Sequence, residues 1–154
     1  MKKLRSSLIF IALFVCAAAA EESGCSGCGA GKLMLQCDYY VVKKGDLDKT
    51  DLCREYADAV DNDGAHAKAA RYYLLGREPQ KALRAALRAI EEGQTYAAQY
   101  AAEASLIFNE FKAAGKYMSM LKKSGIEPWS LEKDLLALKK IYPDTDFDTL
   151  MRVK

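Results

Sequence analysis

Four cysteines follow one another closely after residue 20, at Cys25, Cys28, Cys37 and Cys53. Cys25 and Cys28 are separated by two residues in a glycine-rich stretch, which is the spacing of thiol pairs that attack disulfides or bind a soft metal ion. In an oxidising compartment the four sulfurs can instead form structural disulfides, for which three pairings are possible. A redox pair of this kind normally belongs to a strand–turn–helix unit, and the sequence contains no such unit. We therefore favour a structural role for Cys25 and Cys28, paired with each other or with Cys37 and Cys53.

The first 20 residues have the pattern of an export signal. Three basic residues precede an apolar run from Leu8 to Val15, and alanines at positions 18–20 form a small-residue cleavage site. We expect cleavage before Glu21 and a mature protein that is periplasmic or secreted. The apolar run is shorter than the about 20 residues of a transmembrane helix, so we expect no stable membrane insertion after cleavage.

The charge balance bears on the class of partner. The chain has 23 Lys and Arg against 21 Asp and Glu. Because the signal contains three of the basic residues and no acidic one, the mature chain is close to neutral. A neutral chain has no general attraction for nucleic acid, so we expect no nucleic-acid partner.

Apolar residues from Lys32 onward recur at helical spacing rather than strand spacing. The apolar stripes predict seven helices, over residues 33–41, 52–60, 66–74, 83–90, 97–111, 117–121 and 131–142. Short connections make such helices antiparallel neighbours. The sequence therefore predicts an all-α domain over residues 32–154, built as stacked helical hairpins in a short α-solenoid. Residues 21–31 form a Cys/Gly-rich segment before it, and the tail from Asp144 is expected to add a short helical turn.

Cys37 and Cys53 lie eight residues before and eight residues after Gly45, on the apolar faces of the first two predicted helices. At about 1.5 Å of rise per residue, the two cysteines reach nearly the same height above the turn. Helix axes about 9 Å apart, with Cα atoms about 2.3 Å off each axis, bring facing Cα atoms to roughly 4 to 5 Å. Because a disulfide tolerates this separation, we predict a Cys37–Cys53 bridge.

Two segments share a helical-hairpin pattern. Residues 66–92 contain an aromatic at Tyr73, a turn at residues 76–79, and small residues Ala82 and Ala89, and they resemble a tetratricopeptide-type repeat. Residues 101–123 resemble a second copy that turns at Gly115, and residues 36–60 a degenerate copy that turns at Gly45. The resemblance implies an α-solenoid fragment that binds a partner protein or peptide in a concave groove, and it implies no reaction.

By the same alignment, Arg71, Asn109 and Lys112 belong to first helices of the repeats and are expected to face the groove. The inner turns predicted at Gly45, Gly76 and Gly115 are spaced unevenly, since residue 45 is 31 positions before residue 76 and residue 76 is 39 before residue 115.

Other candidate sites are weaker. Residues 61–64 have the composition of a calcium loop, but Ala59 and Ala70 stand at its first and twelfth ligand positions, so we interpret the segment as a polar turn. His66, the only histidine, lies on an apolar face without a matching nucleophile or base, and we expect it in the core. We therefore expect no catalytic residue, no cofactor and no metal site outside the cysteine pair.

These observations predict an exported helical-repeat protein, stabilised by disulfides, that acts as a protein–protein interaction or scaffold module. The alternative is a thiol–disulfide redox protein or soft-metal-handling protein that uses Cys25 and Cys28.

Overall fold

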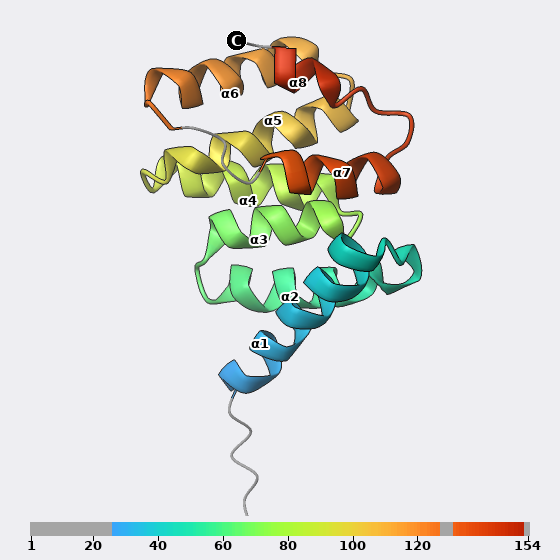
Figure 1. Ribbon diagram of the computed structural model, residues 1–154. Coiled ribbons are helices and arrows are strands. Elements are labelled where there is room, and N and C mark those ends of the chain that lie inside the picture. Colours follow the sequence, from blue (N-terminus) through green and yellow to red (C-terminus); the bar gives the residue numbers. More distant parts are fainter. Residues whose placement is uncertain (1–25, 127–130, 153–154) are drawn as a thin grey trace, which may run out of the picture.

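The computed structural model describes residues 26–126 and 131–152 (Figure 1). The predicted export signal and Cys25 lie outside the described residues, as do residues 127–130 and 153–154.

Every regular element in the described part of the chain is helical, which confirms the all-α prediction. The α-helices are α1 (Ser26–Cys37), α2 (Thr50–Asn62), α3 (His66–Leu75), α4 (Pro79–Glu91), α5 (Ala98–Ile107), α6 (Phe111–Lys123), α7 (Leu131–Ile141) and α8 (Asp148–Arg152). Three short segments complete the set: the π-helical η1 (Asp38–Lys44), which continues α1, and the 3-10 turns η2 (Leu47–Lys49) and η3 (Thr95–Ala97).

The first six helices pack in sequence order. Helix α1 contacts α2, α3 contacts α4 and α5 contacts α6, while α2 on α3 and α4 on α5 join these hairpins to one another. Figure 1 shows them as successive layers along the molecule. Alanine explains the close approach of α4 and α5, because Ala82, Ala85, Ala86 and Ala89 on one and Ala98, Ala101, Ala102 and Ala104 on the other are buried.

Helix α1 begins earlier than the sequence predicted. It starts at Ser26, six residues before Lys32, and includes Gly27, Gly29 and Gly31 of the Cys/Gly-rich segment. Glycine in a helix interior costs about 1 kcal/mol relative to alanine. Packing of Ala30, Leu33 and Met34 against the core offsets that cost, which propensity alone does not anticipate.

The turns inside the hairpins are more regular than predicted. Gly45, Arg77 and Asn109 all adopt left-handed backbone geometry, with φ of 70°, 63° and 60°, and residues 45, 77 and 109 are each 32 positions apart. The turn predicted at Gly115 is therefore wrong, since Gly115 lies within α6. Asparagine is among the few non-glycine residues that enter this conformation readily, so the third turn needs no glycine.

Helix α7 returns across the array instead of extending it. It packs against η1 and α3, two elements that precede it by more than 50 residues (Figure 1). Leu135, Leu138 and Ile141 are buried on its inner side, whereas Leu136 on its outer side is 59% exposed. Helix α8 then packs against α6, next to the fully buried Phe147. The face formed by η1 and α3, with α5 beside it, is called here the Arg71 face.

Candidate functional site

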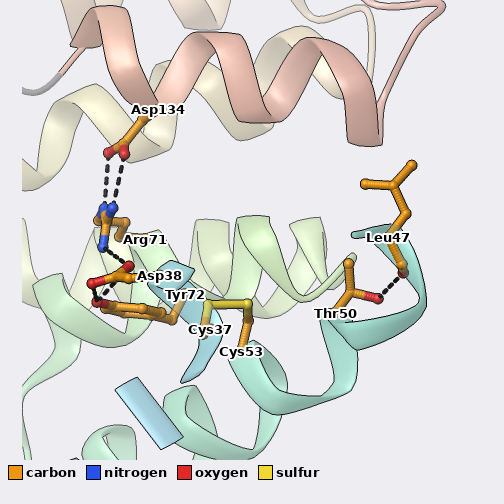
Figure 2. Close-up of a disulfide and its surroundings, with 8 residues drawn as sticks. All are labelled: Cys37, Asp38, Leu47, Thr50, Cys53, Arg71, Tyr72 and Asp134. Carbon is orange, nitrogen blue, oxygen red and sulfur yellow. Dashed lines mark hydrogen bonds and ion pairs between the residues drawn. A yellow bond between two sulfur atoms is a disulfide. The ribbon is translucent and has the colours of Figure 1, made fainter. Parts of the chain in front are cut away.

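Arg71 is the centre of a charged cluster under α7. Its Nε and Nη2 atoms donate hydrogen bonds to the two carboxylate oxygens of Asp134, both at 2.9 Å, and its Nη1 donates to Asp38 at 3.3 Å (Figure 2). The three residues come from α3, α7 and η1. The Asp134 side chain is only 4% exposed. Such a bidentate pair between a guanidinium and a carboxylate is both strong and directional, so it fixes the orientation of α7 on α3.

The cluster raises the pKa of Arg71 above its usual value. Burial alone would lower that pKa, but the hydrogen bond from Arg71 to Asp134 and the negative charge of Asp134 outweigh the effect of burial. Arg71 is therefore a permanent cation in a partly buried site.

Tyr72 supports the same cluster from the neighbouring position. Its hydroxyl donates to the carboxylate of Asp38, with distances of 3.1 and 3.0 Å to the two oxygens, and its ring lies 4.8 Å from the Arg71 guanidinium. The Tyr56 ring packs edge-on against it at 4.5 Å. Burial raises the pKa of Tyr72 above its usual value, so the phenol stays neutral and can donate.

The predicted disulfide lies at the base of this cluster. Cys37 and Cys53 are bonded in the structure, with Cα atoms 5.0 Å apart, as their equal distance from Gly45 predicted. Both are fully buried. Cys37 directly precedes Asp38, so the covalent link to α2 holds the start of η1 and with it the carboxylate that Arg71 and Tyr72 contact (Figure 2).

Glu103 is the most buried acid of the cluster. Its side chain projects from α5 with 1% of the residue exposed, and its Oε1 atom accepts a hydrogen bond from Gln99 at 3.0 Å. Its Oε2 atom is buried and has no hydrogen-bond partner. Burial raises the pKa of Glu103 to about 8, and the negative charge of Asp134 adds to the rise, while Gln99 and Arg71 oppose it. Glu103 is therefore mostly protonated at neutral pH.

Asp38, Glu103 and Asp134 were not among the site residues predicted from the sequence. The sequence did contain a signal for Glu103, which is the one acid in the alanine-rich stretch of α5. Residues of this helix are buried on every side. No comparable signal marked Asp134, whose partner Arg71 lies 63 positions away in the sequence.

Three residues were expected to face a groove, and they lie on different elements of the structure. Arg71 lies on a first helix, between Asp38 and Asp134. Asn109 is exposed in the turn between α5 and α6, and Lys112 is exposed in the first turn of α6. The prediction that Asn109 and Lys112 belong to the first helix of a hairpin is therefore wrong, because the chain turns at Asn109 and not at Gly115.

Of the remaining predicted residues, Cys28 lies in α1 and His66 is the first residue of α3. The backbone of Cys28 belongs to α1, and Cys25 lies outside the described residues, so a role for this pair stays a prediction. His66 is half-buried between two acids, with Nδ1 2.6 Å from Asp61 and Nε2 3.4 Å from Glu92, rather than packed only among apolar side chains. Within residues 26–126 and 131–152, no group of three or more His, Cys, Asp or Glu residues is arranged to hold a metal ion.

Comparison with protein-family models, with curated proteins and with solved structures finds no match to this chain. In the part of the chain that the structure describes, none of the helices combines the length and apolar character needed to cross a bilayer.

Proposed function

We propose that this chain is an exported protein of the tetratricopeptide-like helical-repeat kind, acting as a protein–protein interaction or scaffold module. The observation that carries the proposal is the way α7 is held. The Arg71 face receives a helix through the buried side chains of Leu135 and Leu138 and through one bidentate ion pair. A surface that binds one amphipathic helix in this manner has the chemistry to bind another.

The charge and disulfide pattern supports the same proposal. Near-neutral net charge without the signal favours a protein or peptide partner over nucleic acid. The Cys37–Cys53 bond suits an oxidising location such as the periplasm or the outside of the cell. It also stiffens the first hairpin, and a rigid receptor face loses less conformational entropy on binding.

Crosslinking in the native host tests the proposal. The exported protein should first be recovered with Glu21 as its N-terminal residue. Photocrosslinking from exposed positions should then yield a defined protein partner, whose binding to the purified chain is measured by isothermal titration calorimetry.

Replacing both thiols distinguishes the interaction proposal from the thiol alternative. Under the interaction proposal, the Cys25→Ser/Cys28→Ser chain should bind the partner as the wild-type chain does. If that variant instead loses the cellular phenotype while it still folds, and if Arg71→Met has no effect, the interaction proposal is refuted.

A further inference from the structure

We propose that the natural ligand of the Arg71 face is an amphipathic helix with a carboxylate that pairs with Arg71, and that α7 is its intramolecular competitor. The inference rests on the proposed function and names its partner class. It follows from three features of how α7 is attached.

The first feature is the pattern of anchors on α7. Asp134, Leu138 and Ile141 stand at positions i, i+4 and i+7, and all three are buried. Tyr142, just after the helix, donates from its hydroxyl to the carbonyl oxygen of Leu74 at 2.9 Å. Anchors at this spacing are how an amphipathic helix docks on another protein, with apolar side chains supplying area and one polar contact setting the register. The ligand therefore needs an acid one turn before a leucine-like residue and two turns before a second one.

The second feature is that the receiving surface is braced without α7. The disulfide joins α1 to α2, the hairpins α1 to α6 pack on one another, and Asp38 and Tyr72 hold Arg71 from the side opposite α7 (Figure 2). The Asp38 contact keeps Arg71 paired when Asp134 leaves. The Arg71 face is thus preformed for a carboxylate.

The third feature makes α7 replaceable. Docking of α7 buries the Asp134 carboxylate near the buried carboxyl group of Glu103, whose Oε2 atom has no partner. Desolvation of a buried ion pair offsets much of its attraction, so the pair supplies register and specificity more than net affinity. A ligand helix of equal apolar area that also offers a hydrogen-bond acceptor to the protonated Glu103 carboxyl group would bind more tightly than α7 does.

Fluorescence anisotropy with a labelled peptide tests this arrangement on the full mature chain. The probe is the peptide of residues 131–142, and its matched control is the same peptide with asparagine in place of Asp134. Two chain variants release α7 by different means: Asp134→Ala removes the ion pair, and Ile141→Ala removes an apolar anchor. Leu136→Ser, on the exposed side of α7, is the control variant.

Both releasing variants should bind the acidic probe at least tenfold more tightly than the wild-type chain and the Leu136→Ser chain. The asparagine probe should bind at least tenfold more weakly than the acidic probe. Adding Arg71→Met to either releasing variant should abolish that difference between the two probes. Equal probe affinity for wild-type and releasing variants overturns the inference. Loss of helical circular dichroism in both variants also overturns it, since the receiving face would then not stand without α7.

Two further outcomes separate this inference from the proposed function. If releasing variants form dimers by light scattering that the acidic probe dissociates, the ligand is α7 of a second copy, and the assignment to another protein is wrong. If the native partner binds wild-type and releasing variants equally, the interaction function stands while α7 is not its competitor. If the probe behaves as expected and crosslinking yields no partner, the proposed function fails on its own.

Discussion

Replacing Glu103 with glutamine should stabilise the protein at neutral and alkaline pH. The Glu103 carboxyl group is fully buried on α5, near Asp134, and only Oε1 has a hydrogen-bond partner. Glutamine has the same shape, can still accept the hydrogen bond from Gln99, and never ionises. The substitution therefore removes the cost of a buried carboxyl group that must either stay protonated or be charged without water, and it leaves the packing in place.

The expected size follows from the pKa of Glu103. Burial raises this pKa from the usual 4.5 to about 8. Between these two values the folded protein retains a proton that the unfolded chain has released, so the free energy of unfolding falls as pH rises through this window. Each pKa unit corresponds to about 1.4 kcal/mol. The wild-type chain should therefore be less stable than Glu103→Gln by about 3 kcal/mol at pH 7 and by about 5 kcal/mol above pH 8. Below pH 4.5 both states bind the proton, and the wild-type and Glu103→Gln chains should be similarly stable.

Urea unfolding followed by circular dichroism at pH 4, 7 and 9 measures this difference. The gap between Glu103→Gln and wild type should widen from near zero at pH 4 to several kcal/mol at pH 9. The control is Glu55→Gln, an exposed acid in the middle of α2, which should change stability by less than about 0.5 kcal/mol. Parallel pH profiles for Glu103→Gln and wild type would refute the argument, because Glu103 would then have no raised pKa in the folded state.

Three other changes examine how the helices around the cluster are held together. Replacing both Cys37 and Cys53 with alanine should lower the free energy of unfolding, measured in urea, by about 3 kcal/mol. The wild-type chain treated with a reductant should lose the same stability. An unchanged urea midpoint would show that the disulfide contributes nothing to stability. Gly76→Ala should destabilise by about 1 to 3 kcal/mol, because a Cβ atom there would lie 2.9 Å from the backbone nitrogen of Arg54 on α2. Gly115→Ala should instead stabilise the protein by about 0.5 to 1 kcal/mol, because there is open space around this position within α6. A higher melting temperature for Gly76→Ala than for Gly115→Ala would contradict this packing.

The helices themselves were predictable from the sequence because their signals are local. Apolar residues at helical spacing mark each helix within a few turns of chain, and left-handed glycines such as Gly45 mark where a helix ends. The Cys37–Cys53 bond was predictable for the same reason. Two helices joined by a short turn can pack only side by side, so equal distances from Gly45 determine which residues meet.

The candidate site was decided by tertiary structure alone. Arg71 was expected at an open surface, yet it is paired with Asp134, because α7 packs back on α3 instead of continuing the array. Periodicity shows that α7 has an apolar face but not which surface that face will cover. That surface exists only after η1, α3 and α5 have come together. The raised pKa of Glu103 has the same origin, since it depends on the exclusion of water by helices that are distant in sequence.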